Sequence, residues 1–262
     1  IWQYRDNLIR KSCYALFQLA FPDDTLPALN DGSKSMNLCD EGALMAVSLC
    51  WQHYGPDARL AALMQRQGRV WPSAGAIAME QLDAVDARVR FDESVLLRDG
   101  INGDRGGIGI LRQQDAEQLT HMALLWFGQH GSIPQLHSAL NHGHFDGLHL
   151  SYFSRGREIL HDYGFGRWVN VEPKFGGRYL PENNSYCKQT VAHNTVVVDE
   201  QTQNSASSAQ AETRWGECRF FVTEAQAGQG ISAILRDYVP GVTQQRTVLM
   251  LNLAGLESPL LL

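Results

Sequence analysis

The side chains best suited to chemistry are concentrated between Asn141 and Glu200. This stretch reads NHGHFDGLHLSYFSRGREILHDYGFGRWVNVEPKFGGRYLPENNSYCKQTVAHNTVVVDE and combines histidines, aspartates, tyrosines and arginines in one part of the chain. The packing of a hydrophobic core does not require so many convergent polar groups. We therefore expect the functional site to lie in this stretch.

Two histidines and an aspartate from this stretch could bind a metal ion. His144, Asp162 and His193 lie on three expected strands or at their ends, so a sheet could bring them together although they are far apart in the sequence. Two imidazoles and a carboxylate form a common zinc set, in which water takes the fourth position of a tetrahedron. A core cluster held by hydrogen bonds would use the same residue types, and the spacing alone does not separate the two.

A tyrosine and a third histidine are candidates for proton transfer. Tyr179 lies in the polar, glycine-bordered segment GGRYLPENNSY, which can present a phenol to a ligand, although packing on its own loop is the alternative. Because the reference pKa of tyrosine is about 10, Tyr179 would need cationic neighbours such as Arg167 to act as a base near neutral pH. His142 precedes His144 by two residues and would point to the same face of an extended segment, from which it could reach a substrate.

The other histidines and the cysteines carry weaker signals. The cysteines include no CxxC pair, which argues against a zinc knuckle or a disulfide framework, and we interpret them as small buried hydrophobic residues. The other histidines lack comparable neighbours, and we expect them to be structural or exposed: His53, His121, His130, His137, His149 and His161.

The size, charge and composition of the chain limit which kinds of molecule it could bind. With 262 residues and 44% hydrophobic composition, the chain can bury a sizeable core. A net charge of -6, with acidic and basic residues interspersed, argues against a nucleic-acid groove and against a polybasic membrane surface. No apolar run approaches the roughly 20 residues of a membrane-spanning helix, and the first residues, IWQYRDNLIR, lack the order of a signal peptide, so the start looks internal. The oligomeric state stays open, with a homodimer among the options.

The elements that must position the site change in type near residue 92. Up to that point, apolar residues recur at helical spacing, as in LIRKSCYALFQLAF and EGALMAVSLCWQHYG. Beyond it, runs such as GGIGILRQ, HMALLWFG, ECRFFVTE and AHNTVVVD predict the strands of a β domain. The alternating pattern of LHLSYFSRGREILHD predicts an antiparallel hairpin about Arg155-Gly156, and QTQNSASSAQAE is interpreted as a polar loop.

Three strings within this region make the sequence similar to a known family. HGHFDGLHL, DYGFGRWVNVEPKFGGRYLPENNSYCKQT and AHNTVVVDE closely resemble the C-terminal heparinase II/III-like region of alginate lyases of polysaccharide lyase family 17. The resemblance implies an α+β multidomain fold. Residues 1–92 would be the C-terminal part of an incomplete α/α toroid of helical hairpins. Residues 93–262 would form an antiparallel β-sandwich that is truncated at its end.

The resemblance also implies roles for individual residues. His144, Asp162 and His193 would hold one zinc ion of mainly structural role, Tyr179 would be a catalytic tyrosine, and His142 and Arg167 would line the substrate site. The family's asparagine-histidine pair and second catalytic tyrosine come from earlier in the helical domain, and nothing in residues 1–92 matches them. Residues 132–141 also look longer than the glycine-rich link that the family has before His142.

The reaction implied by the resemblance is β-elimination at uronate residues of alginate or oligoalginate. The site would neutralise the uronate carboxylate, a tyrosine would take the C5 proton, and a tyrosine or histidine would protonate the departing O4. Family members known as oligoalginate lyases act from the chain end and release unsaturated monouronate. The implied location is periplasmic or secreted.

Two other functions remain open from the sequence. A lyase of the same superfamily acting on heparin-like sulfated chains would require more Arg and Lys than this acidic sequence offers. A non-catalytic carbohydrate-binding fragment would use exposed Trp126, Trp168 or Trp215 to stack on sugar rings. Formation of an unsaturated product separates a lyase from a binding fragment.

Overall fold

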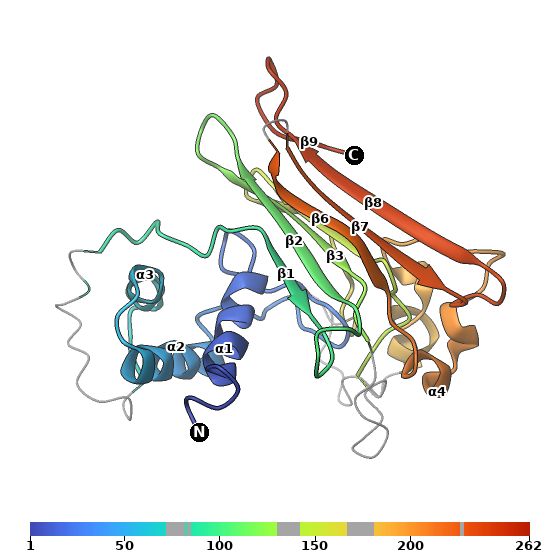
Figure 1. The fold of residues 1–262 in the computed structure, drawn as a ribbon, viewed down its shortest axis with the longest axis horizontal. Coiled ribbons are helices and arrows are strands. Elements are labelled where there is room, and N and C mark those ends of the chain that lie inside the picture. Colours follow the sequence, from blue (N-terminus) through green and yellow to red (C-terminus); the bar gives the residue numbers. More distant parts are fainter. Residues whose placement is uncertain (72–81, 83–84, 130–141, 167–180, 226–227) are drawn as a thin grey trace. The chain divides into compact units, whose positions relative to one another are not determined.

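The computed structural model describes residues 1–71, 82, 85–129, 142–166, 181–225 and 228–262 (Figure 1). The chain divides into two compact units. The helical unit comprises residues 1–26 and 35–93, and the β unit comprises residues 27–34 and 94–262. The short segment 27–34 therefore belongs to the β unit, although the chain on both sides of it belongs to the helical unit.

The helical unit is built around amphipathic helices that share one core. Asp57 caps the third helix, because its carboxylate accepts a hydrogen bond from the backbone N–H of Arg59 at 2.8 Å. Phe17, Val47 and Leu63, one from each helix, are buried in the common core. The helices in the described part of this unit are α1 (Leu8–Leu19), α2 (Glu41–Tyr54) and α3 (Ala58–Gln67).

The first sheet of the β unit contains five antiparallel strands in sequence order. The turn between its last two strands is formed by Arg155 and Gly156, whose φ angles of 50° and 74° are both positive, as a tight hairpin requires. The predicted hairpin is therefore confirmed. The strands are β1 (Val95–Arg98), β2 (Gly107–Gln114), β3 (Thr120–Trp126), β4 (Leu150–Ser154) and β5 (Arg157–Leu160).

The second sheet packs on the first to form a sandwich. Leu111 and Leu125 from the first sheet share a buried core with Ile231 and Val248 from the second. The sheets approach so closely at Gly109 that a Cβ there would collide with Cδ1 of Ile231. The predicted α+β class with an antiparallel β-sandwich is confirmed. The strands of the second sheet are β6 (Glu217–Ala225), β7 (Gly228–Arg236), β8 (Thr243–Leu251) and β9 (Leu260–Leu261).

The strand predicted at AHNTVVVD is not formed. Instead, a 3₁₀ turn precedes His193, whose N–H donates to Thr190 O at 3.1 Å, and only an isolated bridge joins Val198 to Gln201. The β-branched residues suggested a strand, but Val196 is 56% exposed and no neighbouring strand pairs with this run among the described residues. Local hydrogen bonds therefore replace a sheet ladder here.

Short helices dominate the described connection between β5 and β6. The segment QTQNSASSAQAE, interpreted as a loop, contains two of them, and its Gln203 is buried. The Gln203 amide accepts from the N–H of Gly147 at 2.8 Å and donates to its carbonyl at 3.1 Å, so this segment supports the chain next to His144. The short helices are η5 (Asn183–Cys187), η6 (Thr190–Ala192), η7 (Gln203–Ala206) and α4 (Ser208–Ala211).

Among the residues that the structure describes, no helix has both the length and the apolar character needed to cross a bilayer.

Candidate metal centre

The structure brings His144, Asp162 and His193 together in the β unit. One candidate ligand atom from each lies within 4.8 Å of the others, and all three residues are buried. His144 lies in the connection before β4, Asp162 follows β5 by two residues, and His193 directly follows η6. The connections before β4, after β5 and after η6 thus bring together side chains that are distant in the sequence.

Two nitrogen atoms in this cluster have no hydrogen-bond partner among the described residues. They are Nδ1 of His144 and Nε2 of His193, and both are buried. Leaving a buried polar atom unpaired costs about 1–3 kcal/mol, so a closed hydrogen-bonded cluster would be expected to pair them. A divalent ion would engage such nitrogens, and two imidazoles with one carboxylate suit zinc. The residues therefore fit a metal ion.

A further histidine, His149, belongs to this cluster. Its Nδ1 accepts a hydrogen bond from the N–H of Asn194 at 3.2 Å, so in the neutral ring the proton is on Nε2. This Nε2 lies 3.0 Å from Ser151 Oγ and 3.4 Å from Asp162 Oδ2. His149 is therefore a close neighbour of the Asp162 carboxylate.

The expectation that His149 lacks comparable neighbours is corrected by the structure, because its Nε2 lies 3.4 Å from Asp162 Oδ2. A signal for this was present in the sequence. In the alternating run LHLSYFS, His149 shares a strand face with Ser151 and Phe153, and all three are buried.

A carboxylate from the N-terminal part of the chain also reaches the cluster. Asp31 Oδ1 lies 3.2 Å from Nε2 of His144 and accepts a hydrogen bond from Nδ2 of Asn183 at 3.0 Å. Sequence reasoning missed Asp31, because its position in the turn ALNDGSKS carries no signal that links it to a histidine more than a hundred residues later.

Burial and pairing have opposite effects on the pKa values of Asp162 and His193. Burial alone would raise the pKa of Asp162, but the hydrogen bond from His193 and the neighbouring histidines outweigh it and hold this pKa below its usual range. Burial alone would lower the pKa of His193, but Asp162 raises it above its usual value. Burial lowers the pKa of His149, which keeps that ring neutral. Asp162 and His193 therefore each favour the charged form of the other.

Of the three residues proposed to meet a substrate, the structure places one. The His142 side chain is 57% exposed, and its Nδ1 lies 3.3 Å from Asp31 Oδ2, so the ring is accessible yet held on one side. Tyr179 and Arg167 lie outside the described residues, as does the segment 132–141.

A partly buried arginine from the second sheet holds the backbone next to two of the histidines. Arg246 in β8 donates through Nη1 to the carbonyls of Leu148 at 2.6 Å and Asn194 at 2.5 Å. These residues are adjacent to His149 and His193 in the sequence. Burial lowers the pKa of Arg246. The arginine therefore ties two site-bearing segments to the sandwich.

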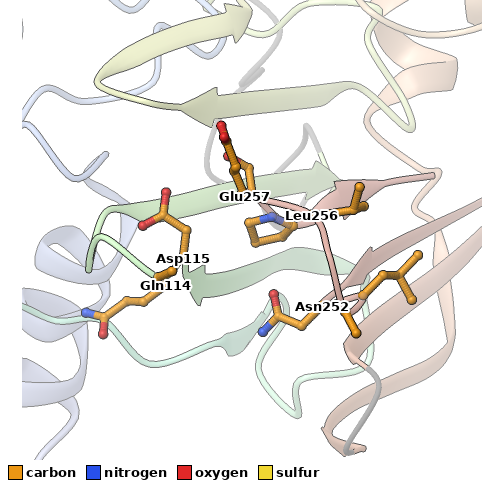
Figure 2. A pocket seen from close by; sticks show the side chains of 10 residues that line it. Gln114, Asp115, Asn252, Leu256 and Glu257 are labelled. Atoms are coloured by element: carbon orange, nitrogen blue, oxygen red, sulfur yellow. The ribbon is translucent and has the colours of Figure 1, made fainter.

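A cavity of about 380 Å³ lies elsewhere in the β unit, between the β2–β3 turn and the loop that leads to β9 (Figure 2). Asp115 lines it, but its Oδ1 accepts hydrogen bonds from two backbone N–H groups, of Glu117 and Leu119, and its Oδ2 lies 3.0 Å from His121 Nε2. His121 in turn lies 2.9 Å from Ser154 Oγ and is fully buried. This carboxylate is occupied in supporting the turn, and the cavity contains none of the predicted site residues.

The tryptophans suggested for a sugar-binding surface are not all available. Trp126 is only 9% exposed, so the expectation of an exposed ring there is wrong. Trp215 is partly buried and lies under the guanidinium of Arg105, 5.5 Å from the ring centroid. Trp168 lies outside the described residues.

The class of protein that contains this antiparallel sandwich is shown by comparison with a known family. Residues 86–258 match the model of the heparinase II/III-like C-terminal family. The chain belongs to this family, and the resemblance inferred from the sequence is confirmed.

Two curated relatives are similar along the whole chain. An alginate lyase of Stenotrophomonas maltophilia is 34% identical over 263 aligned residues, which cover 100% of this chain and 34% of the relative. An exo-oligoalginate lyase of Saccharophagus degradans is 31% identical over 99% of this chain and 34% of its own length. This chain therefore spans about a third of the length of these curated relatives.

Solved structures support the fold. A heparinase III superposes with a TM-score of 0.59 at 15% identity, over 92% of this chain and 32% of that structure. The heparan sulfate lyase HepC of Pedobacter heparinus gives 0.55 at 16% identity, over 91% of this chain and 30% of that structure. At such identities the likeness concerns the fold alone.

Proposed function

We propose that this protein is a polysaccharide lyase that cleaves alginate or oligoalginate by β-elimination at uronate residues. The observation that carries the proposal is the 34% identity to an alginate lyase over the whole of this chain. The likeness to heparinases is much weaker in sequence, at 15% and 16% identity, and the net charge of -6 does not favour a heavily sulfated chain. Exolytic release of unsaturated monouronate is part of the proposal, supported by the relative named exo-oligoalginate lyase.

The proposed chemistry assigns a proton acceptor and a proton donor. Removal of the C5 proton builds charge next to an already anionic carboxylate, so that carboxylate must be neutralised by preorganised donors. Tyr179 takes the proton and His142 contributes to the site from the exposed position described above. Electrons from the broken C5–H bond form the C4–C5 double bond as the C4–O4 bond breaks, a tyrosine or histidine gives the departing O4 a proton, and no water is consumed. Arg167 contributes to binding of the anionic sugar.

We also propose that one zinc ion is held by His144, Asp162 and His193. When bound, the ion supplies a positive charge and a structural link between three connections of the β unit. The unpaired buried nitrogens of His144 and His193 support the proposal. A periplasmic or secreted location is proposed from the resemblance to the family.

The test compares substrates and chain lengths. Residues 1–262 and a form extended to the length of the relatives are incubated with oligomannuronate, oligoguluronate and heparan sulfate, and the unsaturated product is followed by its ultraviolet absorbance. We expect the extended form to act on the alginate oligomers, and residues 1–262 to be nearly inactive because carboxylate-neutralising groups from the preceding helical region are needed. Product from heparan sulfate alone would contradict the substrate assignment. Binding without product in the extended form would favour a carbohydrate-binding function.

A further inference from the structure

The segment 27–34 contacts two of the connections that carry the candidate metal ligands. On one side, the Asp31 N–H donates to His142 O at 3.2 Å, and the His144 N–H donates to Asn30 Oδ1 at 3.1 Å. The first bond holds the backbone of Asp31, and the second holds the side chain of Asn30, against the connection that carries His144. The segment is therefore docked at this point by its backbone as well as by its side chains.

On the other side, the segment touches the loop that carries Asp162. Gly164 has a φ of +55°, and its N–H donates to Asp162 Oδ1 at 2.8 Å. A Cβ at Gly164 would collide with the carbonyl oxygen of Gly32, so the two backbones are in direct contact. The segment 27–34 thus lies against the connections of two of the three candidate ligands.

The side chain of Asp31 determines which nitrogen of His144 is free. Its Oδ1 lies 3.2 Å from Nε2 of His144, and a carboxylate can only accept from that nitrogen, so Nε2 carries the proton. The lone pair is then on Nδ1, which is the buried nitrogen that has no partner among the described residues. Neutral imidazole binds a metal through its unprotonated nitrogen, and the group bonded to the other nitrogen sets the tautomer and the ring orientation.

We propose that Asp31 is the outer carboxylate of the metal centre. It holds His144 in the tautomer that presents Nδ1 to the ion, and through this bond metal occupancy anchors the segment 27–34 to the β unit. Asp31 is a positioning residue and not a ligand. This inference rests on the proposed zinc site.

The anchoring follows from linkage. If the Asp31–His144 contact favours the metal-bound state, the bound metal must stabilise the docked segment by the same free energy. The chain on both sides of 27–34 belongs to the helical unit. Metal binding would therefore stabilise a segment at which the chain passes from one unit to the other.

The experiment measures zinc affinity by competition with a chromophoric chelator, in wild type and in Asp31→Asn, which keeps the shape but removes the charge. Outer carboxylates of this kind typically contribute 10- to 100-fold in affinity, and we expect a loss of about that size. Asp115→Asn is the matched control, because Asp115 is also a poorly exposed carboxylate 3.0 Å from a histidine Nε2, in the same unit but outside the cluster. It should leave zinc affinity unchanged.

A second measurement does not depend on the folding of a variant. Hydrogen exchange of the amides of residues 27–34 is compared in wild type with zinc and with a chelator. We expect slower exchange with zinc, and no zinc-dependent difference in Asp31→Asn.

The outcomes separate the two proposals. If wild type binds no zinc, the metal centre and the role of Asp31 are both refuted. If wild type binds zinc and His193→Ala does not, but Asp31→Asn binds as tightly as wild type, only the role of Asp31 is refuted. A loss as complete as that of His193→Ala would make Asp31 a direct ligand, which also refutes the outer position.

Discussion

Replacing Arg246 with methionine should loosen the backbone next to His149 and His193, two histidines of the buried cluster. The guanidinium donates to the carbonyls of Leu148 and Asn194 at 2.6 and 2.5 Å, and both bonds have a charged donor. Methionine keeps much of the apolar volume of the side chain but leaves both carbonyls without this donor. The segments next to His149 and His193 then lose their common link to β8.

The magnitude follows from these two bonds and from their access to water. A hydrogen bond from a charged donor contributes about 1.5–3 kcal/mol, so two bonds would give roughly 3–6 kcal/mol if nothing replaced them. We expect water to replace part of these bonds, because Arg246 is only partly buried and lines, with Leu148, a cavity of about 220 Å³. We therefore expect a local loss of about 2–4 kcal/mol.

Hydrogen exchange of single amides is the appropriate assay, because the chain consists of two compact units and one global free energy of unfolding is not well defined for it. The N–H of Leu150 donates to Asn194 O at 3.2 Å, and the N–H of Asn194 donates to His149 Nδ1 at 3.2 Å. A loss of about 2–4 kcal/mol corresponds to exchange of both amides that is roughly 30-fold to several hundred-fold faster.

A neighbouring arginine provides the control. Arg236 in β7 is half-exposed and lies 3.8 Å from Glu217, so Arg236→Met should change exchange very little. If Arg246→Met leaves the exchange of both amides unchanged, Arg246 does not hold these segments. If both variants accelerate exchange equally, the effect is a general one of lost charge.

Three further predictions concern the metal centre, catalysis and the helical unit. His193→Ala should reduce bound zinc from about one ion per chain and lower the melting temperature, because one of three protein ligands is removed; equal melting with and without a chelator would refute a structural role for zinc. In a form extended to the length of the relatives, Tyr179→Phe should lower kcat at least ~10²-fold with little change in oligosaccharide binding, whereas more than half of the activity would remain if Tyr179 only packs. Asp57 in the helical unit has a pKa lowered to about 2, because hydrogen bonds from Arg59 and Tyr14 outweigh the effect of burial. Its ionised form therefore stabilises the fold above the unfolded-state pKa of about 3.9, and this contribution is lost as the pH falls through about 2. Thermal melting followed by helical circular dichroism should show Asp57→Asn to be less stable by on the order of 1 kcal/mol near neutral pH, after allowance for solvent screening, and equally stable in strong acid. A deficit that persists in acid would refute the charge argument.

The sequence by itself determined the features that depend on neighbouring residues. The hairpin about Arg155-Gly156 follows from an alternating pattern on both sides of residues that tolerate positive φ, and its formation is a local event. The change from helices to strands near residue 92 follows from the period of the apolar residues in the same way. That His144, Asp162 and His193 lie together could also be anticipated, because the residue types that suit a metal are few in kind.

Only the tertiary structure decided which distant groups complete the cluster. Asp31 and His149 reach it through contacts between segments far apart in the chain, and no local pattern encodes the pairing of Asp31 with His144. The run AHNTVVVD has the composition of a strand but lacks a strand partner among the described residues, so its β-branched side chains did not decide its conformation. A strand requires a neighbour that completes its hydrogen bonds, and an imidazole requires a partner that selects its tautomer. Both requirements depend on residues that only folding can bring near.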